Sequence, residues 1–328
     1  MSKQMKLETW SGGWGLPSID PTCLEIMAYA KFSGVPLKIV RTDNPVNGFM
    51  KSFGTVRCQL PIFRHGETVY YDPKDVLLHF CKENYNAEFG QRCADSLAYE
   101  QMVHTRLSPA LMHAWWIDER NYQDVIRPTL AKKLPFPLNY FYPGHTQRWM
   151  LERIRLHYDL PGDSKDEDNE NWEFIKKDVF RTGKECLNFL SLKLGDSEFF
   201  MGESPRFIDA VIFSHLAPLM RIPLIKNNLQ AHLRATPNLA KFVDRVLQRY
   251  FPTAPEDVPA VVPLPGMAES SRRRNFLICL AGLALMWIYA VSHGHVRVNT
   301  NRLKMTDLQT LESAVEDFYE ANEDGDQT

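Results

Sequence analysis

An uncharged stretch near the C-terminus, residues 275–296, places the strongest constraint on how this chain folds. It carries no formal charge when His293 and His295 are neutral, and residues 276–291 are apolar throughout except for the Tyr289 hydroxyl. At 1.5 Å per residue the whole stretch gives a helix of about 33 Å, which matches a hydrocarbon core of about 30 Å. The strictly apolar part spans about 24 Å, which favours a thin bilayer. We therefore predict a single transmembrane helix over residues 275–296.

The predicted anchor has no polar face, which distinguishes it from a buried helix of a soluble protein. Its large apolar side chains are Phe276, Leu277, Ile278, Leu280, Leu283, Leu285, Trp287, Ile288 and Val291. A proline-rich linker, residues 253–274, leads into it and ends in the basic flank Arg272, Arg273 and Arg274. Because such basic clusters stay on the cytosolic side, the bulk of the chain is expected in the cytosol, as in a tail-anchored protein. Residues 297–328 form an acidic-ended tail that we predict to be disordered.

Composition argues against several classes of protein. A formal net charge of −2 offers no basic excess to a phosphate backbone, so no nucleic-acid binding is expected. The six cysteines are scattered and form no C-x-x-C pair, which argues against a disulfide framework and suits a reducing compartment. The N-terminus has neither the apolar core of a secretory signal nor the composition of a transit peptide.

Residues 1–82 carry alternating strand and helix patterns, which are typical of an α/β domain. Strands are predicted at residues 5–9, 36–40, 59–63 and 68–71. Asp20 is the expected N-cap of a helix that ends near Gly34. Asp72 and Pro73 open a second helix as its N-cap and first helical residue. The predicted order is strand, helix, strand, strand, strand, helix.

Residues 83–252 contain no convincing strand and predict an all-helical domain. A long helical pattern crosses residues 90–116, with a kink expected at Pro109. A second helix continues from about Trp172, after an acidic stretch at 163–173 that is expected to be a solvated loop. The last two helices are a nearly apolar one, predicted to be central and buried, and a closing one, at residues 207–220 and 239–251.

A small α/β unit followed by an all-helical unit, with Leu60-Pro61 leading into the third strand, resembles the glutathione-transferase fold. That fold joins a thioredoxin-like N-terminal domain to an all-α C-terminal domain. In it the proline before the third strand is cis, and Pro61 is the matching position. The resemblance implies that Pro61 and Asp209, in the central helix, are fold-determining residues.

The resemblance also implies where glutathione would bind, and the matching residues depart from the pattern. Ser11, Ser18 and Cys23 follow the first strand, where transferases place the hydroxyl or thiol that stabilises the glutathione thiolate. Tyr71-Asp72 stands where the pattern has Gln or Glu followed by Ser, at a helix N-terminus that receives a carboxylate. A negative charge at Asp72 disfavours a second carboxylate there.

The capping motif of the central helix is altered as well, because Arg206 occupies the position of a capping Ser or Thr, three residues before Asp209. We therefore expect a degraded glutathione site at Ser11, Pro61, Tyr71 and Asp72. The prediction is a protein that is not an enzyme, with no catalytic residue, no cofactor and no bound metal. Two tryptophan pairs are interpreted as core residues, with partner-facing anchors as the alternative: Trp10/Trp14 and Trp115/Trp116.

Four segments resemble the metaxin family in order and spacing: WSGGWGLPSID at 10–20, ENYNAEF at 83–89, FPLNYFYPG at 136–144 and KECLNFLSLKLGDSEFFMGE at 184–203. The resemblance covers roughly residues 5–252. Metaxins are transferase-fold proteins of the mitochondrial outer membrane. The arginine cluster followed by an apolar span is similar to the first, tail-anchored metaxin rather than to the second, which lacks such an anchor.

The resemblance implies a cytosol-facing protein of the mitochondrial outer membrane that pairs with the second metaxin. It also implies association with the sorting and assembly machinery, whose insertase places β-barrel proteins in that membrane, and a part in preprotein import. A link to mitochondrial transport through motor-adaptor proteins belongs to the same expectation. Two alternatives stay open: a membrane-tethered glutathione transferase, and a transferase-like regulator of mitochondrial shape. The residues alone do not indicate which surface binds partners.

Overall fold

The computed structural model describes residues 4–43, 60–85, 94–136, 138–158, 168–225 and 227–252. All of them belong to one compact unit. The predicted linker, basic flank, membrane anchor and tail, residues 253–328, therefore lie outside the described residues. Within the described ranges, no helix combines the length and the apolar character that a bilayer span requires.

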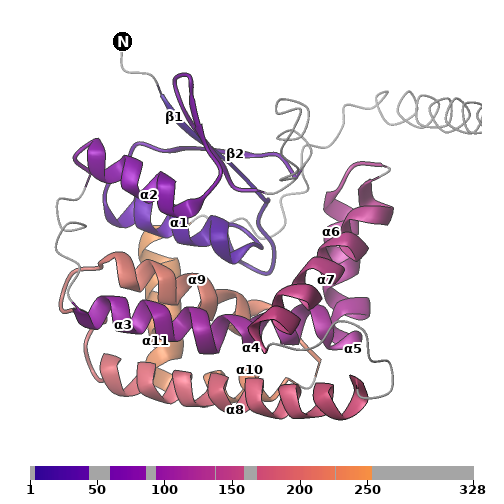
Figure 1. Cartoon of the computed structure of the whole chain (residues 1–328). Coiled ribbons are helices and arrows are strands. Elements are labelled where there is room, and N and C mark those ends of the chain that lie inside the picture. Colours follow the sequence, from indigo (N-terminus) through magenta and orange to yellow (C-terminus); the bar gives the residue numbers. More distant parts are fainter. Residues whose placement is uncertain are drawn as a thin grey trace, which may run out of the picture. The chain divides into compact units, whose positions relative to one another are not determined.

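The N-terminal part is a four-stranded mixed sheet with two helices (Figure 1). Its elements are β1 (Met5–Thr9), α1 (Pro21–Phe32), β2 (Lys38–Arg41), β3 (Ile62–His65), β4 (Thr68–Tyr70) and α2 (Pro73–Lys82). The strand order is β2-β1-β3-β4, with β1 parallel to β2 and antiparallel to β3, and β3 antiparallel to β4. The predicted order of elements is confirmed, although β2 and β3 begin two and three residues later than expected.

Local capping signals explain where these two helices begin. Asp20 accepts a hydrogen bond from the backbone N–H of Cys23 at 2.8 Å. Asp72 accepts one from the backbone N–H of Lys74 at 2.9 Å. Each bond satisfies one of the N–H groups that the first turn of a helix leaves without a partner. Both predicted N-caps are confirmed, and Gly34, at φ +68°, supplies the left-handed conformation just after α1.

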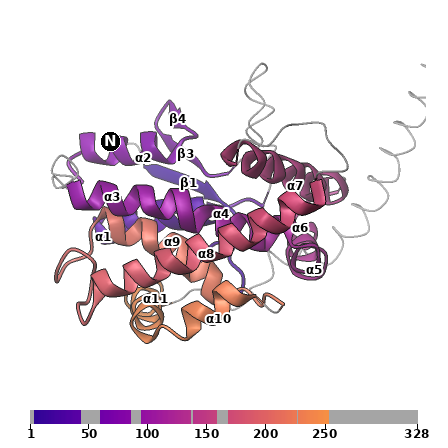
Figure 2. The same cartoon turned by 60° about the horizontal axis from the view of Figure 1, so that its bottom comes forward.

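Every regular element described between residues 94 and 252 is a helix (Figure 2). The α-helices are α3 (Ala94–Met102), α4 (Ser108–Met112), α5 (Glu119–Asn121), α6 (Arg127–Lys133), α7 (Leu138–His157), α8 (Asp168–Leu194), α9 (Phe207–Arg221), α10 (Asn228–Arg234) and α11 (Pro237–Tyr250). Three π-helical turns lie between the early ones: η3 (Val103–Leu107), η4 (His113–Ile117) and η5 (Tyr122–Ile126). The all-helical prediction for this part is confirmed for the described residues.

The long helical pattern predicted around Pro109 is interrupted by a π-helical turn. The N–H of Ser108 bonds to the carbonyl of Val103, five residues back rather than four. Pro109 follows directly and has no N–H with which to continue a regular α-helical series. Where a kink was expected at Pro109, the α-helix is interrupted by a wider, π-helical turn just before the proline.

The predicted acidic loop at residues 163–173 is wrong in its second half, because α8 begins at Asp168. Its first half lies outside the described residues. Negative charges are favourable at the positive end of a helix dipole, and Glu173 pairs with Lys176 one turn later at 3.5 Å. An acidic stretch is thus compatible with the start of a helix as well as with a loop.

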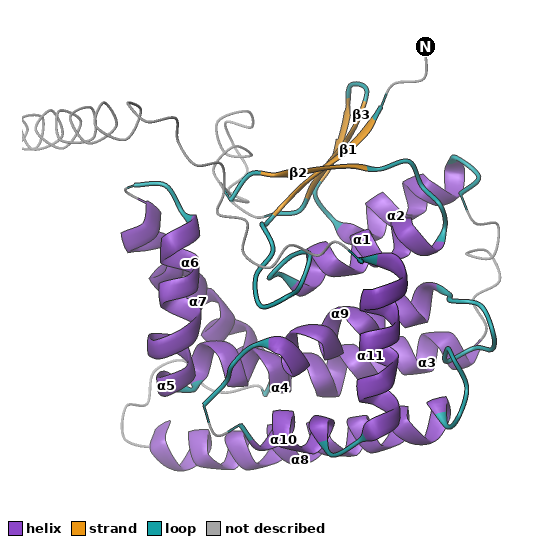
Figure 3. Ribbon diagram, turned by 180° about the vertical axis from the view of Figure 1, so that it is seen from behind, coloured by secondary structure: helices purple, strands orange, loops and turns teal. Residues whose placement is uncertain are grey.

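The core is organised around α9, the central helix of the prediction, which is buried along its length (Figure 3). Helix α1 packs against α9. There, the rings of Tyr29 and Phe207 meet edge to face with centroids 6.0 Å apart. Phe32 of α1 contacts Tyr250 of α11 in the same manner, at 4.7 Å. These aromatic contacts attach the sheet part to the helical part.

The tryptophan pairs belong to this core. Trp10, Trp115 and Trp116 are buried, and Trp14 is partly buried against the core. Their interpretation as core residues is confirmed, and the alternative of partner-facing anchors loses its support.

Candidate functional site

Two of the three residues considered for chemistry after β1 are enclosed in the core. Ser18 is fully buried, and its hydroxyl accepts a hydrogen bond from the N–H of Asp20 at 3.3 Å. Cys23 is fully buried in α1, and burial raises the pKa of its thiol well above the ordinary value. Because the thiolate is the reactive form, this thiol is inert at neutral pH.

Ser11, the third candidate, is held by two hydrogen bonds in the loop after β1. Its N–H donates to Oδ1 of Asp43 at 2.8 Å, and its hydroxyl accepts from Nζ of Lys133 at 2.7 Å. The same ammonium donates to the carbonyl of Gly12 at 2.6 Å. Lys133 is the last residue of α6, so a cation from the helical part fastens the loop that carries Ser11.

The remaining residues of the predicted glutathione site lie around β3, β4 and α2. The Leu60–Pro61 bond is cis, the isomer that the resemblance implied, and both residues are buried. Tyr71 is 36% exposed, and the carboxylate of Asp72 accepts a hydrogen bond from the first turn of α2. Among the described residues, no hydrogen bond joins any two of Ser11, Pro61, Tyr71 and Asp72.

Asp209 ties the N-terminus of α9 to the preceding loop. Its Oδ1 accepts from the N–H of Phe200, and its Oδ2 accepts from the N–H of Arg206, both at 2.8 Å. An arginine side chain has no acceptor, so Arg206 cannot cap the helix through its side chain. Its carbonyl instead accepts from the N–H of Asp209 at 3.1 Å. The carboxylate half of the capping motif is retained, and the hydroxyl half is lost.

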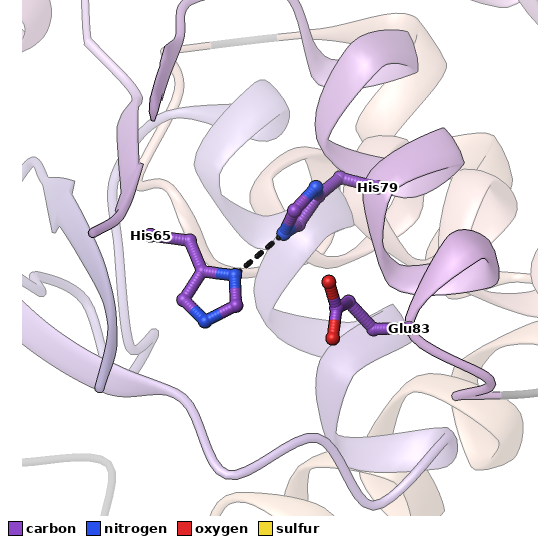
Figure 4. A group of neighbouring side chains, drawn as sticks. All are labelled: His65, His79 and Glu83. Carbon is purple, nitrogen blue, oxygen red and sulfur yellow. Dashed lines mark hydrogen bonds between the residues drawn. The ribbon is translucent and has the colours of Figure 1, made fainter. Parts of the chain in front are cut away.

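A cluster that the sequence reasoning missed lies where β3 ends (Figure 4). His65, His79 and Glu83 each offer one ligand atom, and these atoms all lie within 4.8 Å of one another. Nδ1 of His65 and Nε2 of His79 are 2.9 Å apart, a hydrogen-bond distance. Burial lowers the pKa of His79 below its ordinary value, and the nearness of the His65 imidazole lowers it further. Among the described residues, these three side chains form the one group of histidine, cysteine or acidic residues close enough together to hold a metal ion.

One signal for this cluster was present in the sequence. His79 and Glu83 are four residues apart on a predicted helix, which puts their side chains on the same face. The third member, His65, is brought in by the hairpin of β3 and β4, and this pairing is a tertiary contact.

Comparison with known proteins places these features in a family. Residues 23–147 match the model of a family described as outer mitochondrial membrane transport complex protein. The chain is 39% identical to metaxin-1 of Mus musculus, over 97% of this chain and 99% of that protein. It is also 39% identical to metaxin-1 of Homo sapiens, over 98% of this chain and 68% of that protein. Metaxin-3 of Xenopus laevis is 36% identical over 75% of this chain and 77% of that protein.

The same comparisons bear on the fold. Residues 183–246 match the model of the glutathione S-transferase C-terminal domain. A glutathione transferase of Phanerochaete chrysosporium superposes with a TM-score of 0.51 at 14% identity, over 79% of this chain and all of that protein. The predicted transferase-like fold is therefore confirmed for the α/β and helical parts, while the predicted transmembrane helix remains a prediction.

Proposed function

This chain belongs to the metaxin family, and from that membership we propose that it is a non-enzymatic subunit of the sorting and assembly machinery of the mitochondrial outer membrane. In this role it supports the insertion of β-barrel proteins and the import of preproteins. The match to a family described as an outer mitochondrial membrane transport complex protein supports the proposal, as do metaxin-1 relatives that align over nearly the whole chain. The proposal includes a further role as an adaptor in mitochondrial transport.

The observation that carries the non-enzymatic part is the position of the Asp72 carboxylate. It accepts the N–H of Lys74 at the N-terminus of α2, the place where the transferase pattern receives the carboxylate of glutathione. The carboxylate of a bound glutathione would find the N–H of Lys74 already bonded to Asp72, and it would be repelled by the negative charge of Asp72. Cys23 is buried and protonated, so it cannot serve as the reactive thiol. The described part of this region therefore supports a protein that has kept the transferase fold without its glutathione chemistry.

The location follows from the family and from the predicted anchor. We propose that residues 275–296 cross the mitochondrial outer membrane and that Arg272, Arg273 and Arg274 keep the bulk of the chain in the cytosol. The partners in this proposal are the second metaxin and the β-barrel insertase, with motor-adaptor proteins in the transport role.

Helix α7 offers a surface for such a partner. Large apolar side chains stand out from it: Tyr140 is 66% exposed, Phe141 72% and Leu156 72%. Trp149 is 41% exposed, and the guanidinium of Arg153 lies over its ring at 4.9 Å. Exposed apolar side chains that gather on one element mark protein-binding surfaces, and aromatic residues with arginine are enriched there. We assign this helix to contact with a partner subunit.

Crosslinking followed by affinity capture from intact mitochondria tests the proposal. The full chain should retain outer-membrane assembly subunits and resist alkaline carbonate extraction. Deletion of residues 272–328 should leave a folded, soluble chain in the cytosol that no longer resists carbonate extraction. A truncated chain that still resists carbonate extraction, or a full chain that captures fission factors and no β-barrel insertase, would contradict the proposal.

The second candidate function, a membrane-tethered glutathione transferase, draws on the transferase fold and on Ser11, which follows β1 as a catalytic serine does. Retention of the full chain on immobilised glutathione, together with turnover that Ser11→Ala abolishes, would establish it. Our proposal predicts neither retention nor turnover.

A further inference from the structure

Two histidines and a glutamate gather at one end of the sheet (Figure 4). His65 is the last residue of β3, His79 lies in the last turn of α2, and Glu83 follows directly after that helix. Their ligand atoms lie within 4.8 Å of one another. Two elements that are separate in the sequence thus present three metal-ligating groups to a common point.

We propose that His65, His79 and Glu83 bind a zinc ion. Two imidazole nitrogens and one carboxylate oxygen form a donor set that zinc accepts in tetrahedral sites, with a fourth position left for water or another ligand. Magnesium and calcium prefer sets made wholly of oxygen, so the two imidazoles favour zinc over them. The cluster is distinct from the altered glutathione position at Ser11 and Asp72, so the zinc site does not depend on the proposed function.

The distances require only a modest adjustment. Ligands at about 2.0–2.1 Å from a tetrahedral zinc lie about 3.3 Å from one another. Nδ1 of His65 and Nε2 of His79, now 2.9 Å apart, would separate by about 0.4 Å. The widest pair would close by at most about 1.5 Å. Glu83 is exposed, so a change of its rotamer supplies this movement.

Neighbouring side chains orient the imidazole of His79 toward the cluster. The 2.9 Å hydrogen bond between the two rings requires at least one of them to be neutral. A neutral imidazole is the form that binds a metal. Nδ1 of His79 lies 3.4 Å from the hydroxyl of Tyr70, which leaves Nε2 to face the ion. An outer hydrogen bond of this kind fixes the tautomer and orientation of a ligating histidine.

Aromatic packing alone is the competing role for this cluster. The ring of His79 contacts those of Phe63, Tyr70 and His65, with centroids 5.1 to 5.4 Å apart. Packing explains why the histidine rings are in contact, but it requires no carboxylate beside them. A bound zinc ion would in addition clamp the hairpin of β3 and β4 to the C-terminal end of α2.

The test is zinc binding to the purified, untagged full chain in detergent, measured by competition with a chromophoric chelator. We expect one zinc ion per chain with a dissociation constant in the micromolar range or tighter. His65→Ala and His79→Ala should each weaken binding at least 100-fold, and Glu83→Gln about tenfold. Zinc should raise the thermal midpoint of the wild type and leave that of His79→Ala unchanged, because only a ligand that binds the folded state stabilises it.

Matched controls separate this site from incidental histidines. His145, exposed on α7, is the control, and His145→Ala should bind zinc as the wild type does. Circular dichroism without metal checks that each variant is folded. If His79→Ala does not fold, the test uses His65→Ala, which changes the last residue of a strand. A wild type that binds no zinc at micromolar concentration would overturn the proposal. So would binding that survives His65→Ala and is lost on replacing His293 and His295.

Discussion

Replacing Gly183 with alanine tests how closely α8 packs on its neighbours in the helical part. A Cβ atom at this position would lie 2.8 Å from Cβ of Ala110 in α4 and 3.2 Å from Cδ1 of Leu229 in α10. Carbon atoms in contact are ordinarily about 3.5–4.0 Å apart, so one of the helices has to move. Overpacking of this kind costs about 1–3 kcal/mol. Alanine in place of glycine inside a helix gains about 1 kcal/mol, and the net expectation is a loss of up to about 2 kcal/mol in the free energy of unfolding.

A second glycine provides the matched control. Gly144 lies inside α7, and a Cβ atom there would meet nothing within 4 Å. Gly144→Ala should therefore show the helical gain alone and stabilise the protein by up to about 1 kcal/mol. Adding Ala110→Gly to Gly183→Ala removes the closest contact and should recover part of the loss, which a double-mutant cycle would measure.

The assay is urea unfolding of the full chain, followed by the fluorescence of the buried tryptophans. The reasoning predicts that Gly183→Ala is less stable than Gly144→Ala by about 1–3 kcal/mol, the cost of overpacking. If Gly183→Ala stabilised the protein as much as Gly144→Ala does, the close packing of α8 on α4 would be refuted.

Three further outcomes are expected. Asp209→Ala should lower the free energy of unfolding by about 1–3 kcal/mol in urea unfolding, because two backbone N–H groups lose their acceptor. Acidification from pH 6.5 to 4 should cost up to about 3 kcal/mol through His215, whose pKa is lowered to about 4 by burial, because over this range only the unfolded chain takes up its proton. His215→Gln should lose correspondingly less stability between neutral and acidic pH. Phe141→Ser should weaken crosslinking to the partner subunit without changing stability by more than about 0.5 kcal/mol, whereas Leu192→Ser, similarly exposed on α8, should leave crosslinking unchanged.

The N-terminal part was predictable because its signals are local. Asp20 and Asp72 are helix caps that need only the next few residues, and Gly34 ends a helix by its own backbone conformation. The cis bond before Pro61 was expected only from the resemblance, since proline permits that isomer without requiring it.

The features that escaped prediction depend on distant residues or on ambiguous local patterns. Lys133 reaches Ser11 across 122 residues of sequence, and no periodicity connects them. His65 meets His79 only because β3 and β4 form a hairpin beside α2. The π-helical turn before Pro109 and the early start of α8 follow from packing and helix electrostatics, which hydrophobic periodicity does not report.

Assembly of a newly imported β-barrel precursor in isolated mitochondria measures the central claim most directly. The claim is that this chain serves the outer-membrane assembly machinery without glutathione chemistry. Depletion of the chain should slow assembly of the precursor, and the wild type and Ser11→Ala should restore it equally. Assembly that is unaffected by depletion, or that the wild type restores and Ser11→Ala does not, would contradict the claim.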